Sequence, residues 1–264
     1  MAIINSPAVI LRRVNHSETS LICTFYTREY GKLTAIAKGA RRQKSQFAGL
    51  LDLMNYLDIV VYTKESREVQ TLSSAEFIKP FLNIQRDMER TGVGMILVET
   101  VRQAIIGEEP HPEVFDMLIS VLEVLNSREI AGIELVWWFH LHLASQLGFQ
   151  PRFTHCYECG KSLTGGYFSA DNGQMHCGDC VIRQPGMVSL NHLEIRLLGY
   201  LTRQELGDLD SEAIHRTFPS SASEDDRRRQ IHPEIITEMI VRYLRYHVEG
   251  ITTLRSLDFF ATLN

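Results

Sequence analysis

Two Cys-x-x-Cys pairs constrain the folding of this chain more than any other feature. In CYECGKSLTGGYFSADNGQMHCGDC, 17 residues separate the first pair from the second. A pair of thiolates two residues apart can reach one ion from a tight turn, and two such pairs complete a tetrahedral site. Four sulfurs leave no open position for water or substrate, so we predict a structural zinc site rather than a catalytic one. Its ligands are Cys156, Cys159, Cys177 and Cys180.

Other uses of these cysteines are less favoured by their context. Disulfides need an oxidising compartment, and the opening MAIINSPAVILRR lacks a basic leader followed by an apolar block. A thioredoxin-like redox site needs one pair between a strand and a helix, not two pairs in a loop. His155 and His176 each precede a cysteine and could replace it as a ligand, although four cysteines suffice. No apolar run approaches the ~20 residues that span a bilayer. We therefore expect a cytoplasmic protein that does not enter membranes.

Hydrophobic periodicity predicts an α+β chain. Up to residue 78 the period is near two, which is typical of strands, and Gly31 suits a tight turn. The expected strands are AVILRRV, SLICTFYT, KLTAIAK, YLDIVVYT and REVQTLSSAEF, and five short strands fit a small closed barrel. After Pro80 the period becomes helical. We expect helices at 83–106, 112–126, 129–147, 189–204, 210–217, 233–249 and 254–263, with a polar loop at 219–230.

Positive charge is concentrated near the N-terminus, although the whole chain has a net charge of -5. Residues 1–82 carry 11 Lys and Arg against 7 Asp and Glu, which leaves 16 against 25 for the remainder. The stretch 28–49 holds six cations and one acid, and the barrel adds aromatic rings. Single-stranded nucleic acid binds such mixtures through phosphates and bases. Composition alone supports equally well a second interpretation, in which the loop is merely solvated and the rings are buried in the core. The rings are Phe25, Tyr26, Tyr30, Phe47, Tyr56 and Tyr62.

The order of these features resembles the RecO family of bacterial recombination mediators over nearly the whole chain. The similarity rests on VILRRVNHSETSLICTFYTREYGKL, then AIAKGARRQKS, a helical bundle, the cysteine insert and a closing LRSLDFF. It implies an N-terminal five-stranded OB-fold β-barrel, which commonly binds oligonucleotides. A helical domain with an inserted zinc knuckle module follows. The implied boundaries are 1–80 for the OB-fold, 81–150 and 186–264 for the helical bundle, and 151–185 for the zinc insert.

The resemblance also implies a function. Members of the family bind single- and double-stranded DNA, anneal complementary strands, bind the C-terminal tail of the single-stranded DNA-binding protein SSB, and with RecR help to load RecA. The implied role is non-enzymatic repair in the RecF pathway, in the cytoplasm at the nucleoid. Residues in the segment that resembles the DNA-contacting region of the family are Lys32, Lys38, Arg41, Arg42 and Lys44, with Arg12, Arg13 and Arg28 nearby.

Two other functions compete with a DNA mediator. One is a zinc-braced adaptor whose barrel binds protein and never DNA, and the other is a metal hydrolase. The closed set of four thiolates argues against the hydrolase. The chain also lacks G-x-x-x-x-G-K-[ST] and G-x-G-x-x-G, and no Ser/His/Asp set can be singled out. We therefore expect no enzymatic activity.

Overall fold

The computed structural model describes residues 2–127, 132–182, 184–210, 214 and 231–262. The chain divides into two compact units. Unit 1 comprises Met1–Ala131 and Gly250–Asn264, and unit 2 comprises Gly132–Glu249. Both strands and helices are present, so the predicted α+β class is confirmed. Within the described residues, no helix combines the length and apolar character needed to span a membrane.

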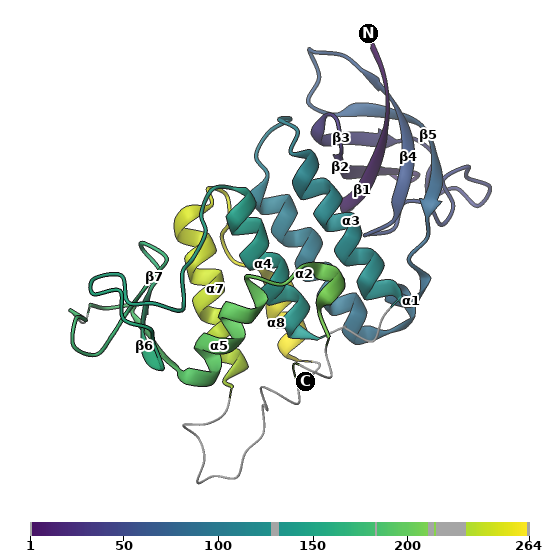
Figure 1. Cartoon of the computed structure of the whole chain (residues 1–264). Coiled ribbons are helices and arrows are strands. Elements are labelled where there is room, and N and C mark those ends of the chain that lie inside the picture. The colour runs from purple at the N-terminus through teal and green to yellow at the C-terminus, as the bar shows by residue number, and fades with distance from the viewer. Residues whose placement is uncertain (1, 128–131, 183, 211–213, 215–230, 263–264) are drawn as a thin grey trace. The chain divides into compact units, whose positions relative to one another are not determined.

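Five strands in unit 1 close into a barrel, as predicted for an OB-fold (Figure 1). The barrel order is β1-β2-β3-β5-β4, with β3 and β5 running parallel where the sheet closes. β1 is longer than the sequence pattern predicted, because its first residues pair with β4. The strands are β1 (Ala2–His16), β2 (Ser20–Thr27), β3 (Gly31–Ala37), β4 (Tyr56–Thr63) and β5 (Gln70–Lys79).

Alternating side chains along β3 separate the core of the barrel from its surface. Leu33 and Ala35 are buried, whereas Lys32 and Thr34, which alternate with them, are partly exposed, as the period of two predicted. Cys23 on β2 is fully buried, and burial raises the pKa of its thiol to about 11. This cysteine is a small core residue and takes no part in the cysteine cluster.

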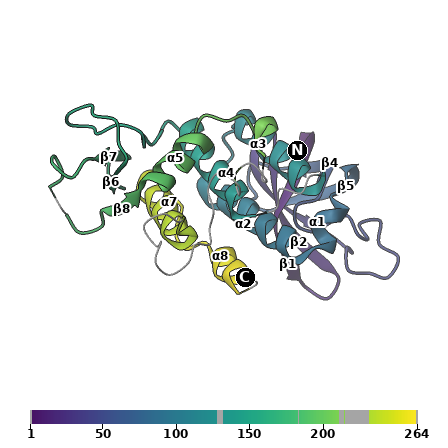
Figure 2. The same ribbon diagram turned by 60° about the horizontal axis from the view of Figure 1, so that its bottom comes forward.

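Helices cover part of the barrel within unit 1. α2 packs against β1, α3 and α8, and Figures 1 and 2 show α2 running beside β1. The prediction of one continuous helix at 83–106 was wrong, because two helices cover this stretch. The backbone of Asp87 is extended, and its carboxylate accepts a hydrogen bond from Arg90 N at 2.8 Å, which starts a new helix. The helices are α1 (Leu82–Arg86), α2 (Met88–Ala104), α3 (Pro112–Ser127) and α8 (Arg255–Ala261).

Gly31 fixes how the turn between β2 and β3 meets the segment that joins α2 to α3. Its φ is +61°, as a tight turn requires. A Cβ at this position would lie 2.6 Å from the carbonyl oxygen of Glu109. The backbone of the turn and the backbone of Glu109 can approach this closely only because residue 31 has no side chain.

The described part of unit 2 contains three named α-helices and a short 3-10 turn, η1 (Leu206–Asp208). Nine of the 14 residues of α4 are buried, in line with its apolar sequence. The indole N–H of Trp137 donates to Thr237 Oγ1 at 2.9 Å, and that of Trp138 donates to Gln204 O at 2.9 Å. The helices are α4 (Ile133–Gln146), α5 (His192–Leu201) and α7 (Pro233–His247).

The cysteine insert contains a small antiparallel sheet rather than only a loop. Its order is β7-β6-β8, and the strands are β6 (Gly165–Ser169), β7 (Gln174–His176) and β8 (Val188–Asn191). The prediction of a helix that begins at Ser189 was therefore wrong, because Ser189 lies in β8 and the helix begins at His192. Asn191 ends β8 and caps α5, because its side chain accepts hydrogen bonds from Leu193 N and Glu194 N at 2.9 and 3.1 Å. Glu194 Oε2 completes the capping box by accepting from Asn191 N.

Two predicted segments lie outside the described residues. Nearly all of the short helix expected at 210–217 and almost the whole of the polar loop expected at 219–230 fall there.

Candidate nucleic-acid interface and metal centre

The four predicted ligand cysteines form one cluster in unit 2. Their Sγ atoms all lie within 4.8 Å of one another, and the Sγ atoms of Cys159 and Cys177 are 3.9 Å apart. Four sulfurs bound to one zinc ion at about 2.3 Å would lie about 3.8 Å apart at the corners of a tetrahedron. None of these cysteines forms a disulfide. The cluster therefore has the size and donors that a tetrahedral metal ion requires.

Backbone hydrogen bonds shape each Cys-x-x-Cys pair into a turn. In the first pair, Gly160 N donates to Cys156 O at 2.9 Å, and φ of Gly160 is +70°. In the second, Cys180 N donates to Cys177 O at 3.2 Å. Cys177 N also donates to Cys156 Sγ at 3.4 Å, which joins the two turns. Four thiolates prefer a soft, tetrahedral ion and leave it no open position, so the centre is suited to bracing the module.

Three of the eight predicted DNA-contacting residues are held within unit 1 by an ion pair or by two hydrogen bonds, and the Arg41 guanidinium also donates a single hydrogen bond to Ser17 O at 3.3 Å. Arg28 forms a two-pronged ion pair with Asp116, with both N···O distances at 2.8 Å. Arg13 pairs with Asp52. Lys32 Nζ donates to Arg102 O at 2.9 Å and to Ile105 O. For these three side chains, a phosphate would have to compete with a partner in the same unit.

Lys32 acts as a cap for the C-terminal end of α2. The two carbonyls belong to Arg102, in the last turn of the helix, and to Ile105, its C-cap. A cation is favoured at this end of a helix by the helix dipole. Burial lowers the pKa of the Lys32 ammonium, and the nearby guanidinium of Arg102 lowers it further. The observed contacts of Lys32 therefore give it a role in attaching the barrel to α2.

The other five predicted residues are exposed, with Arg12 on β1 and the other four in the segment that directly follows β3. None of them forms an ion pair with a residue that the structure describes. Arg41 N donates to Thr19 O at 2.9 Å, which fixes the loop after β3 against the turn between β1 and β2. Phe47 and Leu51 anchor the same loop in the core. The five residues are Arg12, Lys38, Arg41, Arg42 and Lys44, and here they are called the cationic loop face.

A groove lies beside the cationic loop face. Its volume is about 560 Å³, and Arg13, Arg41, Phe47 and Asp52 are among the residues that line it. Asp52 is the one carboxylate among the lining residues, and it is paired with Arg13. The lining of the groove beside Arg41 therefore contains no unpaired carboxylate that would repel a phosphate.

Three of the six aromatic candidates are buried. Phe25, Tyr26 and Phe47 are buried, and Tyr26 donates a hydrogen bond to His111 O at 3.0 Å. Tyr30 and Tyr62 are 42% and 37% exposed. Base stacking by the three buried rings is incompatible with this packing, so they are core residues.

Sequence reasoning missed two features of these sites. It did not predict that Asp52 and Asp116 would pair with Arg13 and Arg28, because the partners are distant in the chain. It also missed a cationic pocket beside the cysteine module, lined partly by Arg152 and Arg203. No motif marks that pocket, since its walls meet only in the folded unit.

Comparisons with known proteins agree along the whole chain. The family described as "Recombination protein O N terminal" matches residues 1–81, and "Recombination protein O C terminal" matches residues 85–258. A protein named DNA repair protein RecO from Chlorobium limicola is 31% identical over 261 residues, covering 99% of this chain and 98% of its own length.

Two further relatives carry the same name. The protein from Salinibacter ruber is 35% identical over 191 residues, which cover 71% of this chain and 72% of the relative. The protein from Acetivibrio thermocellus is 24% identical over 265 residues, which cover 100% of this chain and 98% of the relative. With both halves matched and a 31% identical relative covered almost completely, the chain belongs to the RecO family of recombination proteins.

Proposed function

We propose that this protein is a non-enzymatic mediator of recombinational DNA repair that binds single- and double-stranded DNA through the cationic loop face. The observation that carries the proposal is that four cations within residues 38–44, and Arg12 on β1, are exposed on a five-stranded barrel without ion-pair partners among the described residues. Phosphates attract such a group because local potential, not net charge, controls binding. Arg12, Lys38, Arg41, Arg42 and Lys44 contact phosphates, whereas Arg13, Arg28 and Lys32 contribute to the field from their paired positions.

Binding by phosphate contact also supports strand annealing. Two complementary strands repel each other through their phosphates, and a cationic surface that neutralises part of this charge lowers the repulsion. Neutralised phosphates release their condensed counterions, so binding weakens as salt rises. Because such contacts carry no base code, the protein anneals strands of any sequence.

The metal centre takes a structural part in this function. Its four cysteines would hold Zn²⁺, which supplies folding free energy to the module and no reaction chemistry. Family membership further supports a role with RecR, with the C-terminal tail of SSB and, through them, in the loading of RecA. With these partners, the proposed site of action is the cytoplasm, at the nucleoid.

The Arg41→Ala/Arg42→Ala variant tests the DNA contact. Titration of two labelled single strands of unrelated sequence should show about a tenfold loss of affinity that is similar for both strands, because two phosphate contacts are removed. The matched control is Lys64→Ala/Arg67→Ala, which removes the same charge from exposed positions between β4 and β5. The control should bind within about twofold of the unmodified protein.

Two results would contradict the proposal. Equal losses in both variants would show that only total charge matters. No binding by the unmodified protein at low salt would favour a zinc-braced protein adaptor instead.

A further inference from the structure

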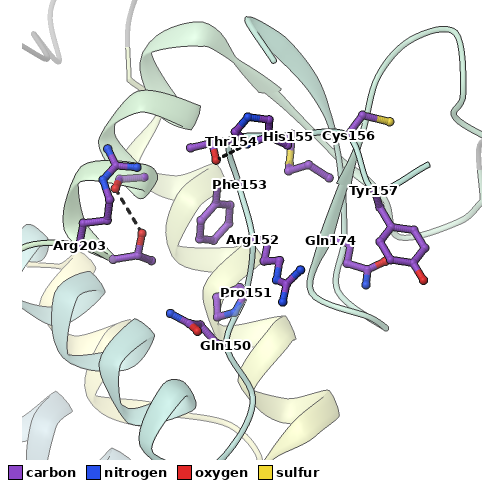
Figure 3. Close-up of a pocket in the computed structure, with 13 residues that line it drawn as sticks. Gln150, Pro151, Arg152, Phe153, Thr154, His155, Cys156, Tyr157, Gln174 and Arg203 are labelled. Carbon is purple, nitrogen blue, oxygen red and sulfur yellow. Dashed lines mark hydrogen bonds between the residues drawn. The ribbon is translucent and has the colours of Figure 1, made fainter. Parts of the chain in front are cut away.

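A second cationic pocket lies entirely within unit 2, beside the cysteine module (Figure 3). Its volume is about 590 Å³, which is within the usual range of ligand-binding sites. None of the residues that line it is an aspartate or a glutamate. The polar groups that could meet a ligand come mainly from Arg152, His155, Tyr157, Gln174 and Arg203.

One wall of the pocket is held in place by the module itself. Arg152 N donates to Gly173 O at 2.8 Å, and Tyr157 N donates to Met175 O at 2.8 Å. A β-bridge joins Cys156 to Met175 between these two bonds. The backbone that carries Arg152 and Tyr157 is thus tied to the turn and strand that lead into the second cysteine pair.

The opposite wall is the C-terminal end of α5. An added Cβ on Gly199 would lie 3.0 Å from Thr154 Cγ2 and 3.4 Å from Arg203 Nη1. The absence of a side chain at residue 199 therefore lets the helix approach the 150–157 segment while the guanidinium of Arg203 stays close to the helix. In Figure 3, Arg203 and Tyr157 lie on opposite sides of that segment.

The available chemistry fits a nucleic-acid strand. Arg152 and Arg203 are exposed and form no ion pair with a described residue. Guanidinium groups bind phosphate oxygens in a two-pronged geometry. The Tyr157 ring is 59% exposed, and its centroid lies 6.3 Å from that of His176 in an edge-on arrangement that restrains it. An exposed, restrained ring on the same segment as a cation is suited to stacking on a base.

Charge and polarity favour nucleic acid over an acidic peptide with an apolar anchor. Residues 132–249 carry 11 Lys and Arg against 15 Asp and Glu, so a pocket without carboxylates is a local exception. Its apolar residues Phe153 and Met175 are buried in the floor, and Tyr157 presents the only large exposed apolar surface among the lining residues. A hydrophobic side chain would find no open apolar slot here.

We infer that this pocket is a second nucleic-acid subsite, in which Arg152 and Arg203 bind the phosphates of a single strand and Tyr157 stacks on a base. The subsite lies in unit 2 and is separate in sequence from the cationic loop face. The inference therefore goes beyond the proposed function, and the proposed function stands without it.

The test uses the full metal-loaded chain and a labelled oligothymidylate. Arg152→Ala/Arg203→Ala should bind about tenfold more weakly, and Tyr157→Ala about fivefold to tenfold more weakly. Tyr157→Phe keeps the ring and should bind like the unmodified protein. The matched control is Lys161→Ala/Arg245→Ala, which removes two exposed cations of unit 2 that do not line the pocket. Circular dichroism of every variant checks that the fold is kept.

Photocrosslinking shows directly which part of the chain contacts the oligonucleotide. An oligonucleotide containing 4-thiothymidine should crosslink to the peptide that contains Tyr157 in the unmodified protein, and the crosslink should be lost in Arg152→Ala/Arg203→Ala.

Three results would overturn the inference. The first is equal affinity of the pocket variant and its control, with crosslinks only in residues 38–44; the proposed function would survive that result. The second is an oligoglutamate peptide whose binding needs Arg152 and Arg203 while oligonucleotide binding does not. The third is no oligonucleotide binding by the unmodified chain, which would remove both proposals.

Discussion

His140 is a buried ionisable side chain near the centre of unit 2. It is 1% exposed on α4, and burial lowers the pKa of its imidazole to about 3. An imidazole in the unfolded chain has a pKa near 6.5. Between these two values the unfolded chain binds a proton that the folded chain does not. The stability of unit 2 is therefore full above about pH 6.5 and falls as the pH drops toward 3.

Replacing His140 should change how stability depends on pH. Between pH 7 and pH 5 the histidine alone should lower the free energy of unfolding by about 2 kcal/mol, and His140→Gln should lack this contribution. The measurement is urea unfolding followed by tryptophan fluorescence, because both tryptophans of the chain, Trp137 and Trp138, lie on α4. Protonation of the cysteines affects both proteins alike, so the difference between the two pH profiles isolates His140. Identical profiles would show that His140 stays accessible to protons in the folded state.

The cysteine module is the element whose stability we expect to depend most directly on a bound ion. Its strands β6, β7 and β8 are short, and a three-residue strand such as β7 supplies few hydrogen bonds of its own. Small modules without a large core commonly depend on a metal for folding. The cluster of four sulfurs within 4.8 Å is the feature that would meet this need.

Removing the ion should unfold the module rather than stop a reaction. A strong chelator should lower the melting temperature by roughly 5–10 °C, which corresponds to a loss of about 2–4 kcal/mol for a chain of this size. Cys159→Ser should lower the melting temperature without chelator and respond little to it. Cys23→Ala is the control, because Cys23 is a core residue of the barrel, and its response to the chelator should be unchanged. A melting temperature insensitive to the chelator in the unmodified protein would contradict a structural metal.

The barrel strands could be predicted from sequence because alternating polarity is a local signal. Helix ends were harder to predict, since the apolar period continues through Asp87 and only the cap formed by its carboxylate reveals the break. The start of α5 was missed for a related reason, as Ser189 pairs in a sheet with Tyr167. Strand pairing within the cysteine module depends on contacts that a single sequence does not display.

The candidate nucleic-acid interface could be predicted as a charged segment, but not residue by residue. The cluster of cations around AKGARRQKS is visible in the sequence. The engagement of Arg28 with Asp116 is not, because their separation in the chain is 88 residues. The cysteine ligands were predictable individually, since their spacing carries the geometry of the site.

At the scale of the whole molecule, charge and function are divided between different parts of the chain. The barrel segment is basic and the remainder is acidic, so the net charge of -5 conceals a local positive field. A mediator has to bind DNA and let it go, which suits contacts that are numerous, individually weak and dependent on salt. Because Arg13, Arg28 and Lys32 already have partners in unit 1, we predict about five such contacts on the barrel.

The salt dependence of single-strand binding tests this central claim most directly. Five phosphate contacts predict a slope of roughly -3.5 in a plot of log affinity against log salt concentration, at about 0.7 per contact. Arg41→Ala/Arg42→Ala should reduce the slope to roughly -2, because about three contacts remain. A slope near zero for the unmodified protein, or the same slope for both proteins, would contradict DNA binding through the cationic loop face.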